Sequence, residues 1–140
     1  MLKIEPQPMA AMIEHGRACF PRECCGIMLG SEAADGARTI TEAIACRNVY
    51  EGDQKDRFQL DVKDILDAER SARARGISLL GFFHSHPDEE AYFSATDLKN
   101  SAPGYSNVVM SIRVGEFAYA KSFIADFAQT HAEPEELQYA

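Results

Sequence analysis

The residues with the clearest capacity for chemistry are two histidines and an aspartate. His84 and His86 are two positions apart at the end of the apolar run 77–83, and Asp97 follows shortly afterwards. Because side chains alternate along a strand, both imidazoles point to the same side of it. Two imidazole nitrogens and a carboxylate oxygen suit Zn²⁺, and three protein ligands are typical of catalytic zinc sites. The spacing therefore indicates a metal site made by His84, His86 and Asp97.

Each half of this pattern also has a purely structural explanation. Two histidines at a strand end are more often surface or hydrogen-bonded residues than metal ligands. Ser94-x-x-Asp97 has the form of a capping box, with Ser94 as the N-cap of a short helix. The capping and metal-binding interpretations are compatible, because a cap fixes the first helical turn and so orients Asp97. The combination favours metal binding, which requires a general base from elsewhere in the chain.

The elements that position these residues follow from the spacing of apolar residues. The run 77–83 predicts a buried strand that ends at Pro87, which has no N–H to donate to a sheet. Helices are predicted over 9–20, 61–75 and 94–100. Further strands are predicted over 23–30, 39–46, 57–60, 107–114 and 117–124, with another near Leu137. We therefore expect one α/β domain spanning residues 1–140.

Composition narrows the classes of function. The chain of 140 residues carries a net charge of −8, which argues against non-specific binding to nucleic acid or to an anionic membrane. No apolar run approaches the ~18 residues of a membrane span, and the first residues lack the apolar core of a signal peptide. We expect a cytoplasmic protein. The four cysteines include no C-x-x-C pair, so they predict packed, reduced thiols and no Cys₄ zinc site.

The motif carries a resemblance to a known family. His84-x-His86-Pro87, the spacer that ends at Phe93, and Ser94-x-x-Asp97 resemble the JAMM (MPN-plus) signature of the Mov34/MPN/PAD-1 zinc metalloproteases. That family also places a glutamate on an early strand in a P-x-E-x-C-G context, which Pro21-Arg22-Glu23-Cys24-Cys25-Gly26 matches. The resemblance spans Pro21 to Asp97, and the order of predicted elements extends it to nearly the whole chain.

The resemblance implies a fold and a set of roles. The fold would be a JAB1/MPN (cytidine-deaminase-like) α/β domain, with a mixed, curved sheet flanked by helices. Zn²⁺ would be held by His84, His86 and Asp97. Glu23 would be the base for the zinc-bound water, and Ser94 would help to stabilise the oxyanion. The alternative for Glu23 is that it marks the exposed start of an apolar strand.

The resemblance also implies a substrate class. Family members hydrolyse the isopeptide or peptide bond after the C-terminal glycine of a ubiquitin-like protein. Compact prokaryotic members are associated with ubiquitin-fold sulfur carriers, so we expect a carrier with a Gly-Gly tail as the substrate. Phe93 stands where many relatives have proline, which bears on substrate preference. Two alternatives stay open: a non-catalytic MPN-type scaffold, and zinc hydrolysis of a small molecule or a generic peptide. The oligomeric state is also open, a homo-oligomer included.

Overall fold

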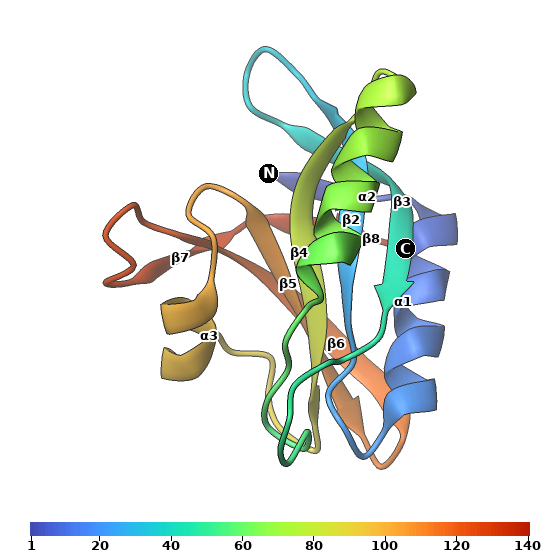
Figure 1. The fold of residues 1–140 in the computed structure, drawn as a ribbon, viewed down its shortest axis with the longest axis vertical. Coiled ribbons are helices and arrows are strands. Elements are labelled where there is room, and N and C mark those ends of the chain that lie inside the picture. Colours follow the sequence, from blue (N-terminus) through green and yellow to red (C-terminus); the bar gives the residue numbers. More distant parts are fainter.

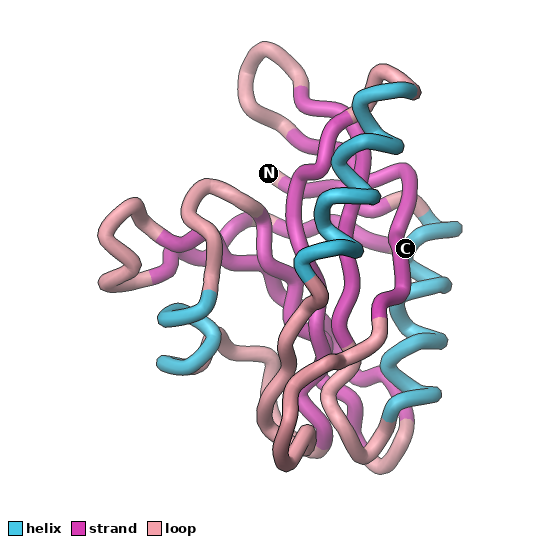
Figure 2. Tube along the Cα trace, viewed as in Figure 1, coloured by secondary structure: helices cyan, strands magenta, loops and turns pink.

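The computed structural model describes residues 1–140, which form eight strands and three helices (Figures 1 and 2). The strands are β1 (Leu2–Ile4), β2 (Cys25–Glu32), β3 (Arg38–Cys46), β4 (Ser78–Pro87), β5 (Ser106–Arg113), β6 (Glu116–Ala125), β7 (Ala132–Glu135) and β8 (Leu137–Tyr139). The helices are α1 (Pro6–Cys19), α2 (Val62–Ala74) and α3 (Ala95–Asn100). All strands belong to one sheet, in the order β7-β6-β5-β4-β2-β3-β1-β8. The sheet is mixed, since β4 is parallel to β5 and antiparallel to β2.

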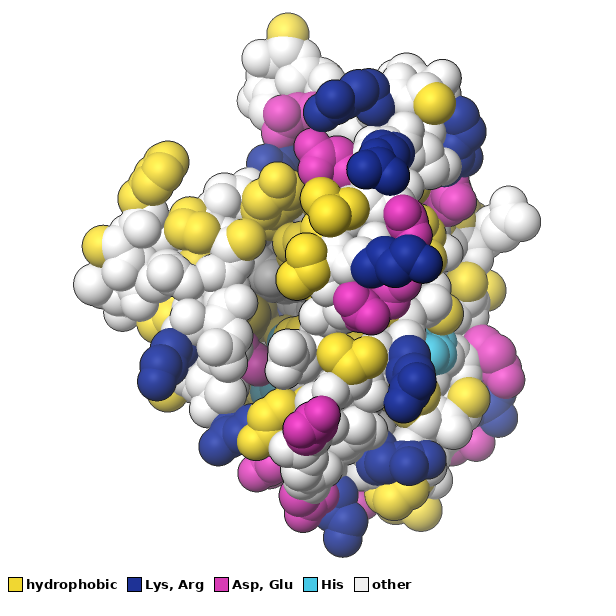
Figure 3. All heavy atoms as spheres, viewed as in Figure 1, with side chains coloured by type: hydrophobic (Ala, Val, Ile, Leu, Met, Phe, Trp, Pro, Cys, Tyr) yellow, Lys and Arg dark blue, Asp and Glu magenta, His cyan; other side chains and the backbone are white.

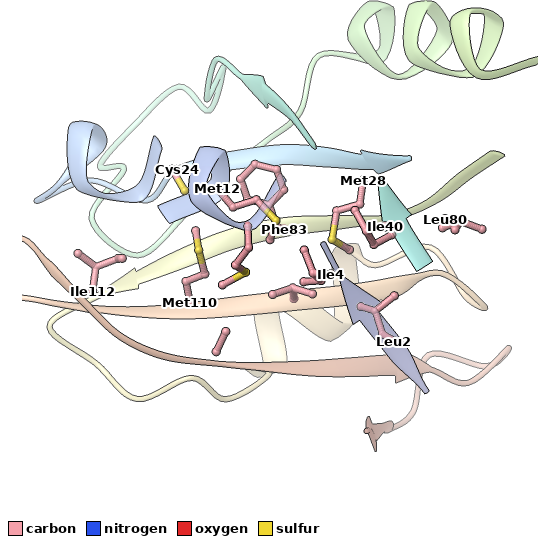
Figure 4. Close-up of a cluster of buried hydrophobic side chains, with 13 residues drawn as sticks. Leu2, Ile4, Met12, Cys24, Met28, Ile40, Leu80, Phe83, Met110 and Ile112 are labelled. Carbon is pink, nitrogen blue, oxygen red and sulfur yellow. The ribbon is translucent and has the colours of Figure 1, made fainter. Parts of the chain in front are cut away.

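The two longer helices cover opposite faces of this sheet. Cys24, just before β2, and Cys25, its first residue, show this, because side chains alternate between the faces. Cys24 packs in the core cluster that contains Met12 of α1, whereas Cys25 packs in the cluster that contains Ala68 of α2. Figure 4 shows the α1-side cluster, in which Phe83 of β4 lies among methionine side chains. The predicted α/β fold with a mixed, curved sheet and flanking helices is confirmed, and all four cysteines are free thiols.

The strand that carries the histidines is held on both sides. β4 lies between β2 and β5, and its pairing with β5 continues as far as Pro87. Ser85, between the two histidines, adds a further tie: its hydroxyl accepts a hydrogen bond from the Cys24 N–H, and its own N–H donates to the Cys24 carbonyl. The backbone that presents His84 and His86 is therefore fixed by neighbours on either side. No helix has the length and apolar character that a membrane span needs.

Several boundaries differ from those predicted. Glu23 precedes β2 instead of lying within it, and residues 57–60 belong to no strand. The turn between β5 and β6 is formed by Val114 and Gly115, both with positive φ, so it begins one residue earlier than predicted. The short strands β1 and β7 were not predicted. β1 has only three residues, too few for a periodicity, and β7 is a largely polar strand at the sheet edge.

Candidate metal centre

Three of the predicted site residues converge at the end of β4. The Nε2 atoms of His84 and His86 lie 3.3 Å apart. Each of them is 3.2 Å from the Oδ2 atom of Asp97. All three side chains are buried. The structure thus places two nitrogen donors and one oxygen donor around a common centre.

The geometry of these donors fits a zinc ion. Bonds of about 2.0–2.1 Å in a tetrahedral site place neighbouring ligand atoms roughly 3.3 Å apart, which is the spacing observed. His86 Nδ1 lies 3.0 Å from the Glu90 carbonyl. Because that contact makes Nδ1 the protonated nitrogen, the lone pair of Nε2 faces the centre, as in a metal-ligating histidine. The nitrogen and oxygen donor set also matches the preferences of Zn²⁺.

Asp97 is oriented by the N-terminus of α3. The Ser94 hydroxyl accepts a hydrogen bond from the Asp97 N–H at 3.0 Å, and the Ser94 N–H donates to Asp97 Oδ2 at 3.0 Å. The predicted capping box is therefore confirmed, and the Ser94 hydroxyl still has its proton to donate. Burial disfavours the Asp97 carboxylate, but the adjacent His84 and His86 and the Ser94 N–H hold its pKa well below the usual range. Asp97 is an anion at any pH of interest.

Phe93 and Arg57 fix the two flanks of α3. Phe93 stacks on Phe123 of β6 with ring centroids 5.6 Å apart. The Arg57 guanidinium donates to the Thr96 hydroxyl at 2.8 Å. Both contacts lie within a few residues of Asp97. They bind the short helix to the sheet on one side and to the segment 57–60 on the other.

Glu23 is buried, with 4% of its surface exposed, and its Oε1 atom has no hydrogen-bond partner. Burial, and after it the negative charge of Asp97, raise the pKa of this carboxyl to about 9. Burying an acid without a partner is costly, so Glu23 is not the exposed start of a strand. In the ladder between β2 and β4, Cys25 lies opposite His84, and Cys24 forms two hydrogen bonds with Ser85. Glu23, the preceding residue, therefore lies next to the end of β4 that carries the histidines. A cation held by these donors would supply the missing opposite charge.

A cleft of about 550 Å³ opens beside the three donors. Its lining includes His84 and Asp97, the apolar side chains Phe58, Leu60, Ile65, Phe82 and Phe93, and polar residues of α3. Phe58 stacks on the His84 ring at a centroid distance of 4.5 Å. Figure 3 shows that this face of the molecule is hollowed between α2 and the arm that carries α3. An extended peptide could lie in this cleft with one end at the donors.

Sequence reasoning missed several residues of this site. The Glu90 carbonyl orients His86, but the sequence places Glu90 in what reads as a solvated acidic loop. The segment 57–60 was predicted as a strand, and instead it lines the cleft. Asn48, in a polar loop, carried no recognisable signal, although it contacts the backbone of both Glu23 and Arg57. These contacts join segments distant in the chain, which local spacing does not reveal.

Comparisons with known proteins agree with this geometry. A family model described as prokaryotic homologs of the JAB domain matches residues 6–123. Over 92 residues, the chain is 32% identical to the desampylase of Haloferax volcanii, covering 65% of this chain and 63% of that protein. Over 91 residues, it is 30% identical to the ubiquitin carboxyl-terminal hydrolase RPN11 of Saccharomyces cerevisiae, covering 62% of this chain and 28% of that protein. The chain thus spans less than two thirds of these curated relatives.

Solved structures show the same fold. A protein from Desulfitobacterium hafniense superimposes with a TM-score of 0.85 at 27% identity, covering 100% of this chain and 93% of that one. A JAB1/MPN domain protein from Archaeoglobus fulgidus superimposes with a TM-score of 0.60 at 17% identity, covering 100% of this chain and 97% of that one. The second likeness shows the fold alone. Together with the family match, it accounts for a mixed sheet with helices on both faces.

Proposed function

We propose that this chain, which belongs to the family of prokaryotic homologues of the JAB domain, is a zinc-dependent peptidase or isopeptidase. It would hydrolyse the bond after the C-terminal glycine of a ubiquitin-like protein. The observation that carries this proposal is the convergence of three buried donor atoms within 3.3 Å of one another. Glu23, a buried glutamate with an unpartnered oxygen, precedes the strand that pairs with the histidine strand at this end. The names of the relatives, a desampylase and a ubiquitin carboxyl-terminal hydrolase, support the substrate class.

Each site residue then has a chemical task. His84, His86 and Asp97 would hold the ion, which when bound acts as a Lewis acid and lowers the pKa of water to ~7. Glu23 would accept a proton from the attacking water and deliver it to the leaving amine. In the metal-free chain, burial raises the pKa of Glu23 to about 9. The positive charge of a bound cation would lower it again, toward the neutral range in which a carboxyl can both accept and return a proton. Ser94 would donate its hydroxyl proton to the developing oxyanion.

The role of Ser94 can be separated from its role as a cap. Glycine at an N-cap costs only a few tenths of a kcal/mol relative to serine, but it has no hydroxyl. We expect Ser94→Gly to change the melting temperature little and to lower kcat by about 10²–10³, the usual effect of losing one oxyanion donor. Melting curves and turnover measured on one preparation give the answer. If Ser94→Gly turns over at the parent rate, Ser94 has no role in the reaction and serves only as the helix cap.

The segment 57–60 offers a way to hold the substrate tail. The Gln59 N–H and carbonyl bond inward, to Asn48 and Val49. The backbone groups of Phe58 and Leu60 alternate with these and make no hydrogen bond, although both residues line the cleft. An extended peptide can pair with such a free edge. A Gly-Gly tail suits this position, because it has no side chains to obstruct the approach to the donors.

A sulfur carrier with cysteine or a short peptide after its terminal Gly-Gly is the proposed substrate. Incubating it with the purified protein should release the added residues and leave the carrier ending in glycine. Intact mass spectrometry follows this directly. The matched control is a carrier with its final glycine replaced by valine, whose side chain should block the tail. If the Gly-Gly adduct stays intact while an unrelated short peptide is cut, the sulfur-carrier assignment is wrong.

A further inference from the structure

The side-chain carboxamide of Asn48 makes four hydrogen bonds to the backbone. Its Nδ2 atom donates to two backbone carbonyls, that of Glu23 at 3.2 Å and that of Arg57 at 3.0 Å. Its Oδ1 atom accepts from two backbone N–H groups, that of Tyr50 at 3.0 Å and that of Gln59 at 3.1 Å. An asparagine side chain has two N–H donors and two acceptor lone pairs. One side chain therefore ties together three separate stretches of backbone.

The backbone of Glu23 depends on these ties. Glu23 lies before β2 begins, so the strand ladder does not hold it. Its carbonyl is bonded by Asn48, and its N–H donates to the Gln54 carbonyl at 2.7 Å. Gln54 is itself anchored, since its side-chain amide donates to the backbone carbonyls of Asn48 at 3.1 Å and Tyr50 at 2.9 Å. Because Glu23 Oε1 has no hydrogen-bond partner, the position of the carboxyl depends on the backbone from which it projects.

The second hydrogen bond that Asn48 donates, to the Arg57 carbonyl, links it to the side of the site that α3 forms. Arg57, whose carbonyl it holds, extends its guanidinium to Thr96. Thr96 precedes Asp97 in the first turn of α3. The path from Glu23 through Asn48, Arg57 and Thr96 thus runs from the proposed base to the helix that supplies a metal donor. Its central link is a single planar group of fixed geometry.

We propose that Asn48 is a positioning residue that sets the Glu23 carboxyl against the His84–His86–Asp97 donors. The inference rests on the proposed function, since it assumes that Glu23 is the base. Asn48 is not among the residues that line the cleft, and it acts through the backbone of Glu23. A displacement of about 1 Å in a reacting group can cost ~10²-fold in rate. Loss of the Asn48 donors should therefore lower kcat far more than it lowers stability.

The test is Asn48→Asp, which keeps an oxygen for Tyr50 and Gln59 but replaces the two donors by an oxygen facing two carbonyls. We expect kcat to fall by about 10²-fold, with KM and zinc content unchanged. Asn48→Gln keeps the amide but lengthens the side chain, so it should lose less activity than Asn48→Asp. It replaces the aspartate variant in the test if that variant does not fold. Asp53→Ala is the matched control in the same loop, because it removes only the bond to the Lys55 N–H.

A double-mutant cycle separates positioning from general destabilisation. In a Glu23→Gln background the base is already absent, so Asn48→Asp should cost no further turnover. An equal loss in both backgrounds overturns the inference, as does an unchanged kcat in the single variant. Amide hydrogen exchange gives a readout that needs no substrate: the Glu23 N–H should exchange faster in Asn48→Asp than in the parent or in Asp53→Ala. Unchanged exchange overturns the inference even if the proposed function stands. Failure of the parent to cleave any adduct overturns the function alone.

Discussion

Replacing His84, His86 or Asp97 with alanine is expected to abolish zinc binding and, with it, hydrolysis. Each residue supplies one of only three donor atoms, so its loss leaves two, too few to hold the ion at a catalytic site. The parent protein should contain about one zinc per chain, and each variant close to none. Elemental analysis of protein purified without chelator or metal-affinity tag measures this directly.

The thermal stability of the same preparations provides a second readout. A ligand that binds only the folded state stabilises it by mass action, so a chelator should lower the melting temperature of the parent but not that of the alanine variants. His131→Ala is the matched control, because His131 is exposed and contacts only Asp126 and Glu133. It should retain zinc and activity. A parent protein without zinc, in which added zinc is not retained, would contradict the whole metal-centre proposal.

The part of the site that could be predicted is the part encoded locally. His84 and His86 alternate on one strand, and Ser94 caps the helix that carries Asp97. Both relations depend on spacing within a few residues, so sequence alone specifies them. The resemblance added Glu23 through its flanking residues, although the sequence placed it within the strand and the structure places it ahead of β2. A buried acid with an unpartnered oxygen is a property of the folded chain.

The rest depends on pairings between distant segments. β1 pairs with β3 and with β8, which brings Leu2 beside both Arg38 and Leu137. Nothing in three residues near the N-terminus indicates either partner. Asn48 likewise looks like an ordinary loop residue until its side chain is seen between Glu23 and Arg57. The cleft itself arises between α2, the segment 57–60 and α3, so no single stretch of sequence contains it.

Glu23→Gln should separate catalysis from metal binding and from folding. Glutamine has the shape of glutamate and can form hydrogen bonds, but it cannot take the proton of the attacking water. We expect the variant to keep its fold and its zinc while turnover falls by at least the ~10²–10⁴-fold typical of losing a general base. Zinc content, melting temperature and adduct cleavage, measured on the same preparation, test the three parts. Asp56→Asn removes a negative charge that helps to raise the pKa of Glu23, and it is the control for a merely electrostatic effect.

In the metal-free protein, Glu23→Gln should raise stability, although it lowers activity in the zinc-loaded protein. Burial raises the pKa of Glu23 to about 9, so between its ordinary value and pH 9 the folded chain binds a proton that the unfolded chain has released. The free energy of unfolding of the metal-free parent should therefore fall as the pH rises through this range. Glutamine does not ionise, so metal-free Glu23→Gln should be the more stable protein at pH 8, although it is the less active one when loaded with zinc. A glutamine variant that cleaves as fast as the parent would remove Glu23 from the mechanism. A variant with the parent's pH dependence of stability would show that the carboxyl is solvated.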